Sequence, residues 1–208
     1  MNKEENKAEF LRLLRSTERE GVEDLIEELE KLGFFEAPAS AGHHLNVDGG
    51  LVEHSLNVCK CALMLREQME QFSPGIKEEC PENSVILASL LHDVCKADIY
   101  RKSIKKRKNR MGGWDDIEGY DVTVKNFPMG HGEKSVVVLL CSGLMMTDAE
   151  MLAIRWHMGP WELPMQSYDA RKQIDAARLI YPLCVLIQTA DGLSASIIET
   201  TAEERDEL

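Results

Sequence analysis

The pair His92–Asp93 constrains the fold of this chain more than any other feature. It sits in the apolar tract SVILASLLHDVC at 84–95, which has the length and character of a buried helix. Charged and imidazole side chains are rarely buried without a partner. The sequence therefore predicts a helical interior that supplies partners for this pair, as either a structural hydrogen bond or a metal site.

Further histidine and aspartate residues stand at other strongly apolar positions. They are His54 in GGLVEHSLNV, His131 in MGHGEKSVVVLL, His157 in LAIRWHMG and Asp191 in LIQTADGLSA. Imidazole nitrogen and carboxylate oxygen are ligands that borderline divalent metals accept. Helices of a bundle can direct such ligands into one core. One of these histidines alone is more often a core residue, but the whole set predicts a metal centre.

Periodicity and turn residues predict a mainly α-helical chain with one β-hairpin. The hairpin is expected at about 99–128, around the pair Gly112–Gly113. Gly33 is the expected C-cap of the N-terminal helices. Helices are expected as two within 2–32, then at about 51–69, 84–95, 133–142, 148–157 and 169–188, with a last one through Ile198. We expect an N-terminal helical appendage over 1–33 and a helical domain over 34–208.

The net charge of −12 means that any site for a polyanion must be local. The only basic block is RKSIKKRKNR at 101–110, which Tyr100 and Trp114 flank. This block is either a nucleic-acid-binding arm with stacking aromatics or a solvated hairpin. No run approaches the ~18 apolar residues that a membrane-spanning helix needs. The N-terminus lacks the apolar segment of a signal peptide, so we expect a cytoplasmic protein with no membrane partner.

The order of the chemistry-bearing residues resembles the HD superfamily of metal-dependent phosphohydrolases. The matching residues are His54, then His92–Asp93, then Asp191. The stretches APAS, HH, GGLVEHSLNV and LLHDVCK are similar to the HD module of some 3′→5′ exoribonucleases and related hydrolases. The resemblance covers roughly residues 34–198 and implies an HD-domain helical bundle.

The resemblance also implies how divalent metal is held. The first ion would be bound by His54, His92, Asp93 and Asp191. In two-metal members the aspartate of the dipeptide bridges, and His131 and His157 match the additional ligand positions. Related sequences often carry paired histidines where this chain has His157–Met158, and Met158 is a poor ligand for a hard ion, so one ion and two ions both stay open. Mn²⁺, Fe²⁺, Ni²⁺ or Zn²⁺ suits this histidine-rich set better than Mg²⁺.

Substrate contacts are expected beside the metal ligands. Asp93 and Lys96 are the expected catalytic residues, and Lys96, one helical turn after Asp93, either holds a substrate phosphate or pairs with that acid. Lys134 is a second candidate for phosphate binding. His44 either lines the pocket mouth or is a solvated loop residue. Trp156 either forms a wall for a nucleobase or packs in the core.

The sequence thus predicts hydrolysis of a phosphoester of a nucleotide or short oligonucleotide by metal-activated water. Two other functions stay open. A di-iron oxygenase of the same fold would use similar ligands, and a non-catalytic module could sense a nucleotide and keep the metal for stability. Oligomeric state and exact substrate are beyond the reach of the sequence, because folds of this kind share a site and differ in what they admit.

Overall fold

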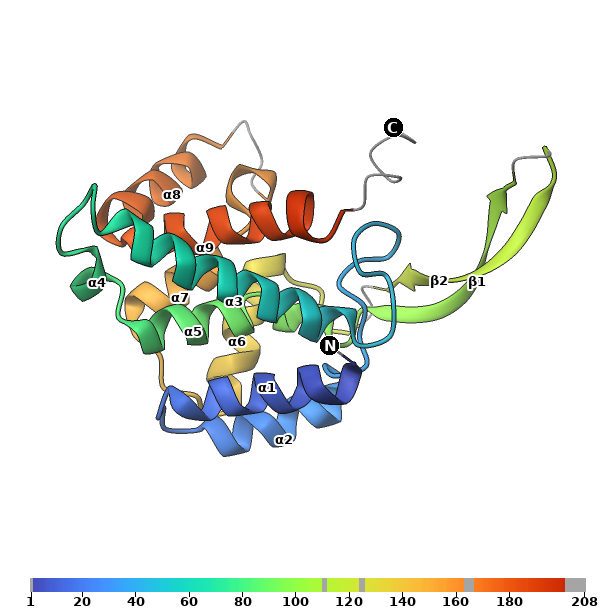
Figure 1. The fold of residues 1–208 in the computed structure, drawn as a ribbon, viewed down its shortest axis with the longest axis horizontal. Helices are drawn as coiled ribbons and strands as arrows, with labels where there is room; N and C mark the ends of the chain where they lie inside the picture. The colour runs from blue at the N-terminus through green and yellow to red at the C-terminus, as the bar shows by residue number, and fades with distance from the viewer. Residues whose placement is uncertain (1, 110–111, 124–125, 163–166, 201–208) are drawn as a thin grey trace.

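The computed structural model describes residues 2–109, 112–123, 126–162 and 167–200. Within these residues the chain is mainly α-helical with one two-stranded sheet (Figure 1), so the predicted fold class is confirmed. The helices are α1 (Lys3–Ser16), α2 (Val22–Leu32), α3 (Gly50–Met69), α4 (Ile76–Glu79), α5 (Glu82–Leu91), α6 (His131–Cys141), α7 (Asp148–Arg155), α8 (Tyr168–Ile180) and α9 (Pro182–Leu193). Shorter turns follow as η1 (Val94–Lys96), η2 (Gly159–Glu162) and η3 (Ser194–Ile198).

Helix α5 lies in the interior because it is apolar on nearly every side. Each residue from Ser84 to Leu91 is buried, as expected of a helix without a polar face. Helix α3 packs against α5 and α9, and α7 packs against the same two helices. The end of α5 is therefore surrounded by helices that are far apart in the sequence.

The N-terminal helices close one side of this bundle (Figure 1). Helix α1 begins with a capping box, in which Asn2 and Glu5 each accept a hydrogen bond from the other's backbone N–H. Helix α2 ends at Gly33, whose φ of 76° is the left-handed conformation predicted for this C-cap. Helix α1 packs against α3 and α5, and Phe10 is part of the same hydrophobic core. The domain boundary at residue 33 stays a prediction.

The helix predicted over 84–95 is shorter than expected. Helix α5 ends at Leu91, and Asp93 has φ −107° and ψ 20° before the turn η1. His92 Nδ1–H donates to the Ser89 carbonyl, the group that a continued α-helix would pair with the Asp93 N–H. The side chain of His92 thus competes with the backbone at the point where the helix stops.

The single helix predicted over 169–188 is wrong, because the structure has α8 and α9 with a break at Tyr181. Pro182 occupies the first turn of α9. Proline lacks the N–H that a continuous helix needs and disfavours helical backbone in the preceding residue, so it starts a new helix. The short helix α4 is a further difference, since a link was expected there.

The hairpin consists of β1 (Tyr100–Lys108) and β2 (Trp114–Val122), paired antiparallel with Lys102 opposite Tyr120. Figure 1 shows that it projects from the bundle. Tyr120 is buried near the base, whereas Trp114 near the tip is exposed. Arg110 of the basic block lies outside the described residues.

Within the described part of the chain, no single helix has the length and apolar character to cross a membrane. Helix α8 and the segment Pro182–Ile198 meet those criteria only together, as a pair bent by 103°.

Candidate metal centre

The structure brings all six predicted metal ligands into one cluster, in which His131 and Asp191 are half-buried and the other four are buried. His54 comes from the first half of α3, His92 and Asp93 follow the end of α5, His131 begins α6, His157 follows α7 and Asp191 lies in the last turn of α9. We call these six residues the metal cluster. Residues as far apart in sequence as His54 and Asp191, 137 positions, therefore contribute side chains to one place.

One half of the metal cluster is built around His54. Its Nε2 lies 3.2 Å from His92 Nε2 and 3.2 Å from Asp191 Oδ1. Asp93 Oδ2 lies 3.4 Å from His92 Nε2 and 3.7 Å from His54 Nε2. Two imidazole nitrogens and two carboxylate oxygens thus face a common point.

The other half of the metal cluster faces the second oxygen of Asp93. Oδ1 lies 2.6 Å from His131 Nε2 and 3.3 Å from His157 Nε2. Close approach of α6 to α7 depends on Gly132, because a Cβ there would lie 2.1 Å from the Arg155 carbonyl oxygen. The carboxylate of Asp93 therefore stands between two groups of histidines, with one oxygen turned to each.

Two of the histidines are oriented by the helix that precedes them. His92 Nδ1 lies 2.7 Å from Ser89 O, and His157 Nδ1 lies 2.7 Å from Ile154 O. The last carbonyls of a helix lack intrahelical partners, so a histidine placed just after the helix end can donate to one of them. Since Nδ1 carries the proton in these bonds, the lone pair is on Nε2, which faces Asp93.

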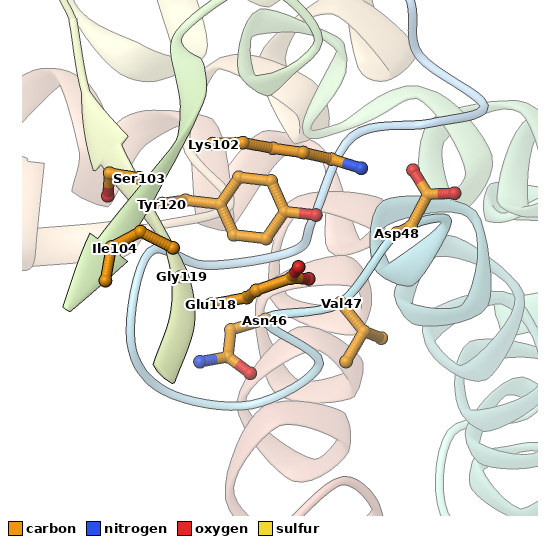
Figure 2. Close-up of a pocket in the computed structure, with 9 residues that line it drawn as sticks. All are labelled: Asn46, Val47, Asp48, Lys102, Ser103, Ile104, Glu118, Gly119 and Tyr120. Carbon is orange, nitrogen blue, oxygen red and sulfur yellow. The ribbon is translucent and has the colours of Figure 1, made fainter. Parts of the chain in front are cut away.

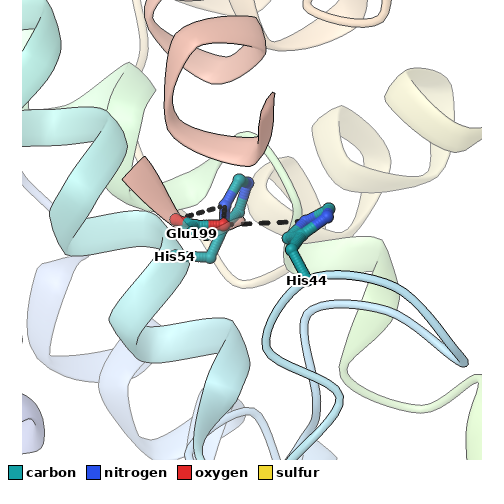
Figure 3. Close-up of side chains that lie close together, drawn as sticks. All are labelled: His44, His54 and Glu199. Carbon is teal, nitrogen blue, oxygen red and sulfur yellow. Dashed lines mark hydrogen bonds and ion pairs between the residues drawn. The ribbon is translucent and has the colours of Figure 1, made fainter. Parts of the chain in front are cut away.

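His54 is oriented by Glu199, which the sequence analysis missed. Its Nδ1 lies 2.9 Å and 3.1 Å from the two carboxylate oxygens of Glu199. Asn57, one turn further along α3, donates to Glu199 Oε1 at 3.0 Å. Figure 3 shows this contact together with His44, whose ring centroid is 5.1 Å from that of His54. The acid after an apolar segment, in SASIIE, was the only sequence signal, and it could not identify the partner.

The fourth histidine, His131, has a cysteine as its neighbour. Its Nδ1 lies 3.3 Å from the Cys95 sulfur. All four histidines of the metal cluster thus have Nδ1 engaged and Nε2 directed inward. Outer partners of this kind fix the ring orientation of metal-binding histidines.

The electrostatics of the metal cluster favour charge despite burial. Burial opposes ionisation of Asp93, but Lys96, His92 and His131 outweigh it and hold the pKa of Asp93 well below its usual range. Burial likewise lowers the pKa of His54, but hydrogen bonds to Asp191 and Glu199 outweigh it and raise this pKa to about 9. Burial is also outweighed at His131, where Asp93 raises the pKa to about 9.

A divalent cation fits these residues better than protons do. His157 Nε2 is buried and faces Asp93 Oδ1 at 3.3 Å without the geometry of a good hydrogen bond to the described part of the chain, and such an atom calls for an explanation such as an ion. His54 Nε2 and His92 Nε2, both hydrogen-bond acceptors when neutral, face each other at 3.2 Å. Donor atoms of the metal cluster also form groups compact enough to hold a metal. The chain therefore has a His/Asp cluster that could hold a divalent metal.

The predicted substrate-binding residues lie at different depths. Lys96 Nζ is 2.6 Å from Asp93 Oδ2, at the edge of the metal cluster. Lys134 is buried and pairs with Asp98. Trp156 is 6% exposed, belongs to the hydrophobic core and has the Arg155 guanidinium over its ring. His44 is half-buried beside His54. Of the four, Lys96 and His44 contact the metal cluster, whereas Lys134 and Trp156 contact other groups.

Comparisons with known proteins identify the family of the chain. Residues 51–196 match the family model described as HD domain. Over 61 residues the chain is 39% identical to a dihydroneopterin 2′,3′-cyclic phosphate phosphodiesterase of Methanocaldococcus jannaschii, a match that covers 29% of this chain and 23% of that protein. The matched stretch is thus about a quarter of the relative's length. No solved structure matches the chain. Because the family model covers more than half of the sequence, the chain belongs to the HD domain family.

Proposed function

We propose that the chain is a metal-dependent phosphohydrolase that cleaves a phosphoester of a nucleotide or short oligonucleotide with metal-activated water. The observation that carries the proposal is the convergence of four histidine Nε2 atoms on the carboxylates of Asp93 and Asp191. Membership of the HD domain family and the similarity to a phosphodiesterase support the same class of reaction.

We propose two metal positions that share Asp93. His54, His92, Asp93 and Asp191 would hold one ion, and Asp93, His131 and His157 would hold the other. The two oxygens of Asp93, each turned to a different group of histidines, support this assignment. Because imidazole dominates the donor set, Mn²⁺, Fe²⁺, Ni²⁺ or Zn²⁺ is favoured over Mg²⁺.

Bound divalent metal supplies charge for the phosphate oxygens and lowers the pKa of coordinated water towards neutrality. The protein's own groups prepare the site for this. Lys96 is near enough to Asp93 to hold a phosphate oxygen at the edge of the cluster once the carboxylate is shared with metal. Glu199 keeps the Nδ1 proton of His54 in place, so that Nε2 stays available. The near-complete burial of His92 and Asp93 excludes bulk water from the interior side.

Hydrolysis of bis(p-nitrophenyl) phosphate by the purified protein tests the proposal. We expect turnover with Mn²⁺, none after chelation, and none in Asp93→Ala. Elemental analysis of the purified protein measures metal content directly. A panel of 2′,3′-cyclic nucleotides, nucleoside monophosphates, short oligonucleotides and dihydroneopterin 2′,3′-cyclic phosphate then identifies the ester.

Other outcomes would replace the proposal. Oxygen consumption by the anaerobically iron-loaded protein, without phosphoester cleavage, indicates an oxygenase. Metal and nucleotide binding without turnover on any ester of the panel indicates a sensing module. A cytoplasmic location stays a prediction.

A further inference from the structure

A cavity of about 420 Å³ lies between the bundle and the base of the hairpin. Figure 2 shows its two walls. One wall is the loop segment Asn46–Asp48, and the other is the face of the hairpin that carries Lys102, Glu118 and Tyr120. Lys102 stands opposite Tyr120 and Ile104 opposite Glu118 in the strand register, so these four side chains share one face. We call this space the hairpin cavity.

Three polar side chains that line the hairpin cavity are exposed to solvent and, within the described part of the chain, unpaired. Among the described residues, the side chains of Asn46, Lys102 and Glu118 have no hydrogen-bond or ion-pair partner. Asp48 differs, because it pairs with Lys3 at 2.9 Å. Of the charged residues that the structure describes in the hairpin cavity, Lys102 and Glu118 are therefore the unpaired ones. A cavity with a few convergent polar groups and apolar neighbours is the usual form of a small-molecule site.

The loop that forms one wall is held in a fixed shape. Ser40 Oγ donates to the His44 carbonyl at 2.9 Å, and the Ala39 N–H donates to the Leu45 carbonyl at 3.1 Å. Leu45 has φ 46°, a conformation that is costly for a residue with a branched side chain and is typical of functional sites. Gly50 permits this arrangement, since a Cβ there would lie 2.1 Å from the Leu45 oxygen. The wall is thus preorganised.

Both walls of the hairpin cavity lead to residues that lie beside the metal cluster. On the loop, His44 contacts His54 and is only two residues from Asn46, a span of at most about 7 Å. On the hairpin, Tyr100 contacts Tyr120 edge to face, with ring centroids 6.3 Å apart, and lies close enough to Lys96 and Asp93 to interact with their charges. Tyr100 also lines a second cavity that shares Asp48, Lys102 and Tyr120 with the first. No residue of the metal cluster lines either of these two cavities, so a ligand with its phosphate at the metal cluster would have to pass His44 or Tyr100 to reach the hairpin cavity.

We propose that the hairpin cavity binds the heterocycle of the substrate, and that Glu118 and Lys102 select a 2-amino-4-oxo-pyrimidine ring, the ring edge that guanine and pterins share. This inference rests on the proposed phosphohydrolase function. The two adjacent N–H groups of such an edge match the two oxygens of the Glu118 carboxylate, which is an acceptor only. The carbonyl oxygen of the ring accepts from Lys102, as guanine O6 accepts from lysine in nucleic-acid recognition.

The same groups disfavour adenine. Its corresponding edge presents one amino group beside a ring nitrogen that is an acceptor, and this nitrogen faces a carboxylate oxygen instead of donating to it. Adenine also has no carbonyl for Lys102. A good bidentate contact discriminates between bases by about tenfold or more.

Size and charge favour a single nucleotide-sized ligand over a polynucleotide. The cavity volume of about 420 Å³ is in the lower part of the range of small-ligand sites. The basic residues of β1 are also opposed by acids of β2: Lys106 lies 3.9 Å from Asp116, Lys105 pairs with Asp121, and Arg107 is opposite Asp115. The hairpin therefore offers little unbalanced positive charge for a phosphate backbone.

The test compares the 2′,3′-cyclic phosphates of guanosine, adenosine and dihydroneopterin on the Mn²⁺-loaded protein. We expect KM for the two amino-oxo compounds to be about tenfold lower than for the adenosine compound. Glu118→Gln should remove this preference by raising KM for the two amino-oxo compounds to the value for the adenosine compound. The matched control Asp116→Asn is on the same strand and face but outside the cavity, and should keep the preference. The amino-oxo compound with the lower KM shows whether the ring of the substrate is a guanine or a pterin.

Failure of the proposed function and failure of this inference have different signatures. If no compound is hydrolysed, the same compounds are stable ligands, and calorimetry measures their Kd values with the same expected ratios. Equal KM or Kd values for guanosine and adenosine compounds in the wild-type protein overturn the inference, even if both are hydrolysed. So does undetectable binding of all three compounds. Identical behaviour of Glu118→Gln and Asp116→Asn, with both folded by circular dichroism, overturns it as well.

Discussion

The metal cluster and the hairpin both concentrate charged side chains, and they do so in opposite environments. In the metal cluster, His54, His92 and Asp93 are at most 2% exposed. In the hairpin, the side chains of Lys106 and Asp116 are 73% and 66% exposed. Buried charges lose hydration that their mutual attraction often fails to restore, whereas exposed pairs neither cost nor contribute much.

This difference indicates which region the chain maintains for function. Each histidine of the metal cluster has a separate group that orients it, and such a cluster is a poor way to stabilise a fold. Hydrophobic residues of similar volume would serve stability at least as well. The cross-strand pairs of the hairpin need no such explanation, because their charges remain in water.

The largest expected effect separates the two regions directly. Asp93→Ala removes the carboxylate that faces both groups of histidines, so we expect hydrolysis to fall by more than the ~100-fold typical of losing an outer partner of a metal ligand. Metal content should fall as well. Asp116→Ala removes a carboxylate from the hairpin and should leave kcat and metal content unchanged. Equal losses in both variants would refute the contrast between the regions.

A smaller effect is expected from Glu199, which touches a proposed ligand without being one. Glu199→Ala leaves the buried Nδ1–H of His54 without an acceptor, and we expect metal affinity to weaken about 10- to 100-fold in calorimetric titration. Glu199→Gln keeps an oxygen acceptor and should lose less. Glu23→Ala, which breaks an exposed pair with Arg15, is the control. Wild-type metal affinity in Glu199→Ala would show that Glu199 does not orient His54.

The pH dependence of metal binding follows from the histidines that face carboxylates. In the metal-free protein the pKa values of His54 and His131 are raised to about 9, so metal must displace protons from them. Apparent affinity should therefore rise between pH 6.5 and 9, by about tenfold per pH unit for each histidine that loses a proton. Titration in buffers of different ionisation enthalpy counts the protons released. Affinity that is flat over this range contradicts the pKa values.

The same raised pKa values affect the stability of the metal-free protein in the opposite sense. Each of these histidines has a folded-state pKa above the unfolded value of 6.5. Its protonation therefore stabilises the fold fully below pH 6.5, and this contribution is lost as the pH rises towards 9. The melting temperature of the metal-free protein should accordingly fall over this interval. With metal bound, the protons are already gone and this loss should disappear.

Much of the fold and of the metal cluster could be predicted from the sequence, because polar residues in apolar helices are costly and therefore conspicuous. His92–Asp93 stands out for that reason, and the hairpin stands out by its glycines. The break between α8 and α9 could also have been predicted, because Pro182 cannot continue a helix from the preceding turn. The role of Glu199 was not readable, since its contact with His54 joins residues 145 positions apart. The hairpin cavity depends in the same way on a loop and a strand whose proximity only the tertiary structure sets.

The smallest expected effect is at the exposed pair Lys106–Asp116. It measures how little a charged pair of the hairpin contributes to stability, compared with the charges of the metal cluster. A double-mutant cycle with Lys106→Gln and Asp116→Asn, measured by urea unfolding, should give a coupling free energy of about 0.2–1 kcal/mol at low salt and less at high salt. An isolated two-stranded hairpin is marginally stable, and this one is anchored at its base by the buried Tyr120. The pair Lys106–Asp116 near the tip therefore contributes little to the stability of the hairpin. A coupling well above 1 kcal/mol would mean that the hairpin charges act as a structural unit, and the contrast with the metal cluster would then rest on burial alone.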